Sequence, residues 1–226
     1  MRLPFSAGQF FDVFREYNQS VWPMQPVLVT AALLLVALAL VSPRSSRVVV
    51  AGLAALWAWM ALAYHLAFFA ALTPAAYVFA AAFLVEAALL VWHGLRTRRL
   101  HFALPREASG TIVGTLLIAF ALVGYPAIAY VLGQQYPAVP TFGLPCPTVI
   151  FTLGLLTWCV RPVPRSVLVI PAAWALLGMS AALDFGVWED LGLLPAAILA
   201  LGFMLWPRTR RTPVGPKSDR PLQLGF

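Results

Sequence analysis

Charged residues are scarce in this chain of 226 residues. Only 10% of the residues are Asp, Glu, Lys or Arg, and 62% are hydrophobic, whereas a soluble domain typically carries about 25% charged residues. This deficit indicates that lipid is the solvent around most of the chain. The formal net charge of +7 is concentrated in short loops, which favours a role in membrane orientation and argues against nucleic acid as a partner.

Cysteine and the usual catalytic motifs are also scarce. The two cysteines, Cys146 and Cys159, lie on one predicted helix, roughly 20 Å apart at 1.5 Å per residue. A disulfide needs Cα atoms within about 7 Å, so we expect no bond between them. The sequence has no zinc or haem spacing, Walker motif, nucleophile elbow or HExxH pattern. We therefore expect neither an enzyme nor a bound metal or cofactor, and we expect no cleavable signal peptide.

Long apolar segments dominate what is present. A spanning helix needs about 20 apolar residues, and a backbone exposed to lipid must satisfy its own hydrogen bonds, which favours helices. The sequence therefore predicts an all-α polytopic membrane bundle of seven transmembrane helices, of which the fifth and seventh are short. The predicted segments are Trp22–Val41, Val48–Leu72, Pro74–Val91, Thr111–Leu132, Pro147–Val160, Ser166–Leu183 and Leu191–Trp206.

The basic residues predict the orientation of these helices. Thirteen of the fifteen Lys and Arg residues follow helices one, three, five and seven, and the alternate loops have none. Because cytoplasmic loops carry the excess of Lys and Arg, we expect the N-terminus outside and the C-terminus in the cytoplasm.

Residues 1–21 have the pattern of an amphipathic helix. Ser6 and Gln9 form a capping-box pattern, and Phe10, Phe14 and Tyr17 recur at helical spacing. We expect this segment to lie on the outer membrane surface or to pack on the bundle. The opposite terminus, residues 207–226, is rich in Pro, Arg and Gly and is expected to be a disordered cytoplasmic tail.

An internal repeat divides the transmembrane domain, residues 22–206. When the sequence is shifted by 121 residues, Pro26 aligns with Pro147, and sixteen of the 57 positions in the aligned stretch are identical. The alignment predicts a 3+1+3 parallel-repeat layout, with repeat one at 22–93, a linker helix at 111–132 and repeat two at 145–206. Shared composition and coincidence are the alternative explanation.

Glu86 is the first candidate for function, because it lies near the middle of the third predicted helix. A carboxylate there costs a few kcal/mol by insertion scales. It must therefore face the bundle interior, be protonated or have a partner. Proton coupling or cation binding is one reading, and a protonated Glu bonded to a neighbouring helix is the other.

Further candidates gather at the predicted outer ends of the helices. Tyr64 and His65 lie near the outer end of the second helix, and Cys146, between two prolines, opens the fifth. Gln25 is the position equivalent to Cys146 in repeat one, and Asp184 lies in an acidic outer loop.

Structural explanations are also open: His65 as an interfacial hydrogen-bonded histidine and Cys146 as a small apolar residue at a helix cap. Glu189 and Asp190, in the same acidic loop as Asp184, are explained by the dipole of the seventh helix, at whose start they lie. Together the candidates predict a ligand or ion pathway that opens outward. We expect Cys146 to line its polar mouth, because the flanking prolines should leave nearby carbonyl groups without intrahelical partners. The length that the short fifth helix lacks should also fall at this outer end.

Three stretches of sequence resemble an uncharacterised family of bacterial integral membrane proteins. They are residues 9–14, 142–148 and 183–190, that is QFFDVF, FGLPCPT and LDFGVWED. The resemblance implies the cytoplasmic membrane of a bacterium and lends no functional residues. In architecture alone the layout is similar to SWEET-type sugar carriers, although their Pro-Gln signature is not matched. The leading hypothesis is a small-solute carrier or permease-like protein for a small molecule or cation. The alternative is a non-transporting structural or sensory membrane subunit.

Overall fold

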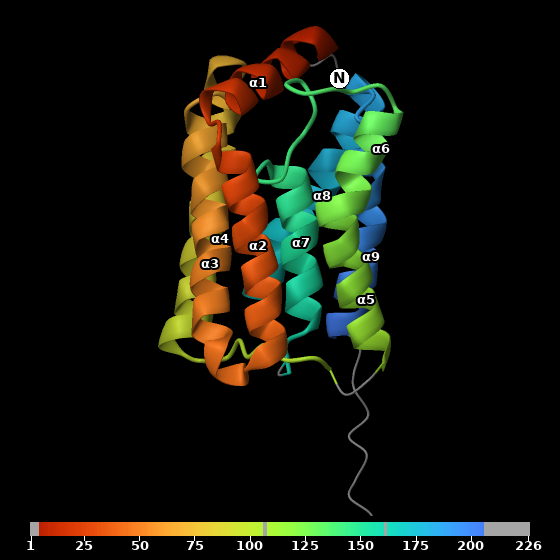
Figure 1. Cartoon of the computed structure of the whole chain (residues 1–226). Helices are drawn as coiled ribbons and strands as arrows, with labels where there is room; N and C mark the ends of the chain where they lie inside the picture. The colour runs from red at the N-terminus through yellow and green to blue at the C-terminus, as the bar shows by residue number, and fades with distance from the viewer. Residues whose placement is uncertain (1–4, 106–107, 161, 206–226) are drawn as a thin grey trace, which may run out of the picture.

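The computed structural model describes residues 5–105, 108–160 and 162–205, and over these the chain is an all-α bundle with one short helix across its end (Figure 1). Several helices continue through a π-helical turn: α3 into η2, α4 into η4, and α5 through η5 into α6. The elements are α1 (Ala7–Ser20), α2 (Met24–Val41), η1 (Pro43–Ser45), α3 (Ser46–Trp59), η2 (Met60–Leu66), η3 (Phe69–Ala71), α4 (Ala75–Val91), η4 (Trp92–Arg96), α5 (Ala108–Ala119), η5 (Phe120–Gly124), α6 (Tyr125–Val131), α7 (Pro145–Thr157), α8 (Ser166–Phe185), η6 (Trp188–Gly192) and α9 (Leu193–Leu205).

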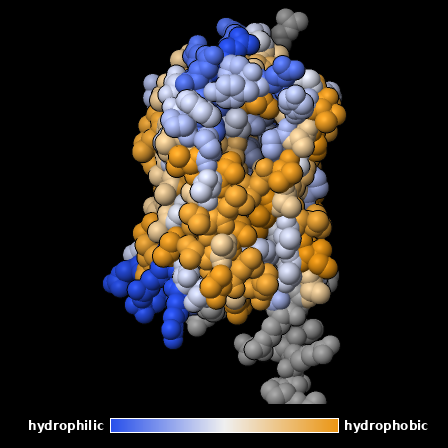
Figure 2. Space-filling view, in the orientation of Figure 1, coloured by the Kyte–Doolittle hydropathy of each residue, from blue (hydrophilic) through white to orange (hydrophobic). Residues whose placement is uncertain are grey.

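Within these ranges, five helical segments are long and apolar enough to cross a membrane: Met24–Val41, Ser46–Ala71, Ala75–Arg96, Ala108–Val131 and Ser166–Phe185. The prediction that the fifth helix is short agrees with α7, which has 13 residues. The structure describes α9 only as far as Leu205, so the length of the seventh helix stays a prediction. Figure 2 shows an apolar belt around the visible face of the bundle, with hydrophilic side chains at both ends. The chain is therefore a multi-pass membrane protein.

Helix α7 is the central element of the bundle. Every side chain from Pro145 to Thr157 is buried except that of Cys146, which is half-buried. It packs closely on α5, where a Cβ atom on Gly114 would collide with the side chain of Thr157, and one on Gly154 would lie 2.9 Å from Ile118. Small residues of this kind let membrane helices pack closely.

Buried threonines on α7 satisfy polar groups inside the bundle. The indole nitrogen Nε1 of Trp57 donates a 3.1 Å hydrogen bond to Oγ1 of Thr152, which in turn donates to the carbonyl oxygen of Thr148 at 2.8 Å. The hydroxyl oxygen of Thr148 accepts a 3.2 Å bond from the backbone N–H of Gly143. These bonds connect α3, α7 and the loop before α7 in the buried interior of the bundle.

Helix α1 lies across one end of the bundle (Figure 1), as its amphipathic pattern predicted. Its inner face buries Phe10, Val13, Phe14 and Tyr17. The capping box is confirmed, because Oγ of Ser6 accepts from the Gln9 backbone N–H and the Gln9 side chain accepts from that of Ser6.

The helix ends opposite α1 carry the loop arginines. Arg44 and Arg47 adjoin the turn between α2 and α3, Arg96 ends η4, and Arg98 and Arg99 follow it; all five are exposed. Figure 2 shows a strongly hydrophilic patch at this end. The side of the membrane on which it lies remains a prediction from charge. The expected tail at 207–226 lies outside the described residues.

The two predicted repeats differ in one aspect of their packing. Helix α9 packs extensively on α7, whereas the equivalent pair, α4 and α2, has at most a marginal contact. The rotational repeat therefore stays a prediction.

The expectation that both cysteines lie on one helix is wrong. Helix α7 ends at Thr157, and Cys159 pairs with Phe102 in an isolated β-bridge. Both cysteines are free of disulfides.

Candidate functional site

The short length of α7 creates a recess below α1. Its 13 residues span about 20 Å at 1.5 Å per residue, against roughly 30 Å for the hydrocarbon core. Figure 1 shows the preceding loop descending into the bundle to reach the start of α7, well below the neighbouring helix ends. The shortfall in length is therefore located at the α1 end, where the sequence placed it.

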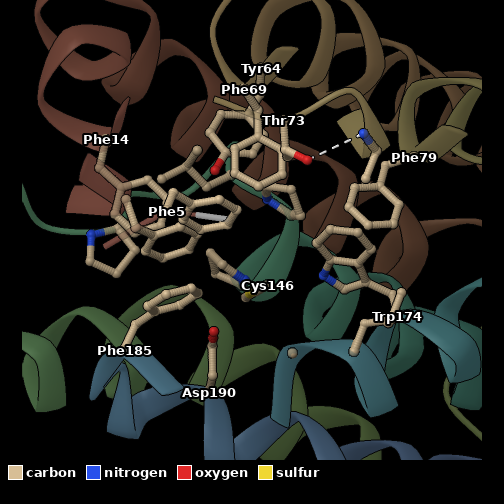
Figure 3. Close-up of a pocket in the computed structure, with 18 of the residues that line it drawn as sticks. Phe5, Phe14, Tyr64, Phe69, Thr73, Phe79, Cys146, Trp174, Phe185 and Asp190 are labelled. Carbon is tan, nitrogen blue, oxygen red and sulfur yellow. Dashed lines mark hydrogen bonds between the residues drawn. The ribbon is translucent and has the colours of Figure 1, made fainter. Parts of the chain in front are cut away.

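This recess holds a cavity of about 320 Å³ that is lined mainly by aromatic rings. That volume is at the lower end of the range for small-molecule sites. Nine of its nineteen lining residues are aromatic. Six are phenylalanines: Phe5, Phe10, Phe14, Phe69, Phe79 and Phe185. The other three, Tyr64, Trp174 and Tyr125, add polar groups at their ring edges. Figure 3 shows Tyr64 and Trp174 among the lining side chains.

The N-terminal segment covers this cavity through ring stacking. Phe10 stacks on Phe185, at the end of α8, with ring centroids 4.7 Å apart, and Phe5 stacks on the same ring at 5.2 Å. Phe5 and Phe10 also meet Phe69 edge to face. Stacking of this kind contributes about 1 kcal/mol per pair beyond area burial, so the cover is held by weak, separable contacts.

The opposite end of α1 is fixed by hydrogen bonds. Asn18 is fully buried, and its Nδ2 donates to the carbonyl oxygens of Pro137 at 2.7 Å and Val139 at 2.8 Å. Its own Oδ1 accepts from the hydroxyl group of Thr141 at 2.7 Å, and its backbone oxygen accepts from Nε2 of Gln25 at 2.7 Å. Helix α1 is therefore firmly anchored at its C-terminal end.

Asp190 is the acidic residue of the cavity. It comes from η6, is only 2% exposed, and points from the wall opposite Phe14 (Figure 3). The hydroxyl group of Tyr125 donates a hydrogen bond to its Oδ1. Burial raises the pKa of Asp190 from 3.8 to about 7, an effect that bonds from Tyr125 and Cys146 oppose and the neighbouring Glu189 reinforces. A carboxyl group with this pKa changes its charge near neutral pH.

Two of the sequence candidates line the cavity, and a third lies behind its wall. Tyr64 and Cys146 contribute directly. His65 is fully buried with Phe83 at 4.7 Å and Trp174 at 5.3 Å between ring centroids. Neither nitrogen of its ring has a hydrogen-bond partner within the described ranges.

The remaining candidates lie elsewhere. Gln25 is buried in the hydrogen-bond network of Asn18 and does not line the cavity. Asp184 is exposed and also lies outside the lining. Glu86 is fully buried, away from the lining, and neither of its carboxyl oxygens has a hydrogen-bond partner in the part of the chain that the structure describes.

The surroundings of Cys146 differ from the expected polar mouth. Pro145 and Pro147 fall in the first turn of α7, where backbone N–H groups lack intrahelical partners in any case, so the helix starts regularly. The expected unpaired carbonyl groups therefore do not follow from these prolines. The thiol faces an apolar, covered cavity in place of a polar opening.

Sequence reasoning missed the principal acid and the aromatic box. Asp190 was explained by the dipole of the seventh helix, and its aromatic neighbours are spread over five separate segments. No local pattern marks such an assembly. The one available signal was an acidic residue directly before an apolar segment, and Glu189 shares it. Within the described residues no group of three His, Cys, Asp or Glu side chains could hold a metal ion.

These features define a multi-pass α-helical membrane protein with a covered aromatic cavity at one end. Residues 7–214 match the family of unknown function DUF6064, and the chain belongs to that family. No curated protein and no solved structure matches the chain.

Proposed function

We propose that this protein is a small-solute carrier of a bacterial cytoplasmic membrane, and that its solute occupies the aromatic cavity below α1. The cavity is the observation that carries the proposal. It combines a largely apolar wall with a few convergent polar groups, which is the usual composition of a small-molecule site. Sugar-type solutes are disfavoured, because this wall offers few hydrogen-bond partners.

Charge distribution supports an outward-opening cavity. The exposed arginines lie at the opposite end of the bundle, which the positive-inside rule assigns to the cytoplasm. Below the cavity, the buried rings of Trp57, Phe83 and Phe151 fill the middle of the bundle. We infer an outward-facing, covered state, in which release to the cytoplasm requires these rings to part.

A transport assay tests the proposal and separates it from the alternative of a sensory or structural subunit. Purified protein in liposomes would be given phenyltrimethylammonium, benzenesulfonate and glucose, which represent a cation, an anion and a polar neutral solute. We expect uptake of an aromatic solute above that of empty liposomes. Ala75→Phe, which adds a ring to the cavity wall, should abolish the uptake.

Val78→Phe is the matched control, since Val78 lies on the same helix and is 68% exposed on its outer face. It should transport like the wild type. Specific binding that Ala75→Phe removes, without uptake of any solute, would favour a sensory subunit. Neither binding nor uptake of any of the three solutes would overturn the proposed function.

A further inference from the structure

The ring faces around the cavity form a suitable environment for a positive charge. Aromatic faces are negative, and they attract an organic cation within about 6 Å of the ring centroid. Phe14, Phe69, Phe79, Trp174 and Phe185 surround Cys146 and Asp190 from different sides in the close-up (Figure 3). A cation with apolar substituents could therefore contact several rings at once.

Asp190 supplies the matching negative charge. It is the only Asp or Glu that lines the cavity within the described residues, and no Lys, Arg or His there lines it. Among the described residues, its hydrogen-bond partners are two uncharged donors, the hydroxyl group of Tyr125 and the thiol of Cys146. An ionised, buried carboxylate without a cationic partner is costly. To avoid this cost, the carboxyl group of Asp190 must bind either a proton or a cation.

We propose that the cavity selects a monovalent organic cation, an ammonium group with apolar substituents, with Asp190 as its counter-ion. This proposal rests on the proposed function and adds the chemical class of the solute. Aromatic rings alone would also accept a neutral apolar molecule. The buried carboxyl group distinguishes the two, because only a cation offsets the cost of ionising it.

A proton and an organic cation would compete for the carboxyl group of Asp190, so the affinity for the cation should depend on pH. The titratable groups that face Asp190 are Tyr125, Cys146, Tyr64 and Glu189. Because the pKa of Asp190 is about 7, a cation must displace a proton at low pH and meets a carboxylate at high pH. Affinity for a permanent cation should therefore rise about tenfold from pH 6 to pH 8, following the ionised fraction.

The decisive experiment compares phenyltrimethylammonium with tert-butylbenzene, its uncharged isostere of the same shape. Binding to the full-length protein in lipid nanodiscs would be measured at pH 6 and pH 8, with empty nanodiscs subtracted. We expect the cation to bind more tightly than the isostere at pH 8, and only the cation to depend on pH. This comparison uses the wild-type protein and does not depend on how well any variant folds.

Two asparagine variants assign the effect to one carboxyl group. Asp190→Asn should lower affinity for the cation at least tenfold at pH 8, remove its pH dependence and leave the isostere unaffected. Asp184→Asn makes the same change on the exposed surface, and should behave like the wild type.

The outcomes distinguish this inference from the proposed function. If the isostere binds as well as the cation at pH 8, the cation proposal is overturned and the solute-binding cavity stands. If cation binding persists in Asp190→Asn, Asp190 is not the counter-ion and the proposal fails. If neither compound binds and benzenesulfonate and glucose are also not taken up, the proposed function fails with it.

Discussion

The side-chain nitrogen Nδ2 of Asn18 lies 2.8 Å from the carbonyl oxygen of Val139, 121 residues away in the chain. With the bond to Pro137, it joins α1 to the long loop that descends toward α7. The same amide begins an Asn-Gln-Ser sequence that matches a glycosylation site. Its complete burial excludes it as an acceptor in the folded protein.

Asn18→Asp is expected to destabilise the protein by about 3 kcal/mol, because it removes two buried donors and turns a carboxyl group toward carbonyl oxygens. Thermal unfolding in nanodiscs would measure the change. Gln19→Glu makes the equivalent change at the exposed neighbouring residue and should have little effect. Equal stability of the two variants would show that the network does not anchor α1.

The pH dependence of stability should carry the signature of Asp190. Its pKa of about 7 in the folded protein lies above its ordinary value of 3.8, so the native state holds a proton that the unfolded state loses. The free energy of unfolding should therefore fall as pH rises from about 4 to about 7, by on the order of 4 kcal/mol for this group alone. Glu189, whose pKa burial also raises, acts in the same direction.

Asp190→Asn should reduce this pH dependence and be more stable than the wild type at pH 8. Its side-chain oxygen can still accept the hydrogen bond from Tyr125. Unfolding would be followed at pH 5 and pH 8, with Asp184→Asn as the control. A pH profile unchanged by Asp190→Asn would show that this carboxyl group does not titrate between these values.

The contact between α5 and α7 depends on the absence of side chains at two glycines. Gly114→Val would place methyl groups where the side chains of Thr157 and Trp158 lie, and should cost about 1–3 kcal/mol through overpacking. Gly202→Val is the control, since a Cβ atom there meets nothing within 4 Å. Similar unfolding temperatures for the two variants would contradict the close packing.

Replacement of Glu86 should have opposite effects on the stability of the protein and on transport, if Glu86 takes part in transport. Its buried carboxyl oxygens lack hydrogen-bond partners within the described residues, so Glu86→Leu should stabilise the protein by about 1–3 kcal/mol. Glu86→Gln keeps the polar group and should give no such gain. If Glu86 couples transport to protons, both variants should lose uptake in liposomes. Full uptake by Glu86→Leu would assign Glu86 no part in transport.

The sequence predicts those features of this protein that depend on residues close together in the chain, and it misses those that depend on residues far apart. Hydrophobic runs specify helices locally, which is why α2, α4 and α8 lie close to their predicted bounds. The Ser6–Gln9 capping box is local in the same way. The bond between Tyr125 and Asp190 joins residues 65 positions apart, and no periodicity encodes such a pair. Glu86 stood out in the sequence because it interrupts an apolar run, whereas Asp190, at the edge of one, did not.

Labelling of Cys146 tests both the cover and the orientation. Its thiol lines the cavity that Phe10 also lines, whereas Cys159 is buried and pairs with Phe102, three residues after the exposed Arg99. An impermeant maleimide added outside intact cells should label Cys146 slowly and spare Cys159. Phe10→Ala removes a ring that stacks on Phe185, 4.7 Å away, and should speed the labelling by weakening the cover. Phe11→Ala, on the same helix but outside the cavity lining, is the control and should label at the wild-type rate.

If Cys146 reacts only with reagent supplied from the cytoplasmic side, the orientation inferred from the arginines is reversed. If it reacts only after denaturation, even in Phe10→Ala, the segment over the cavity does not open.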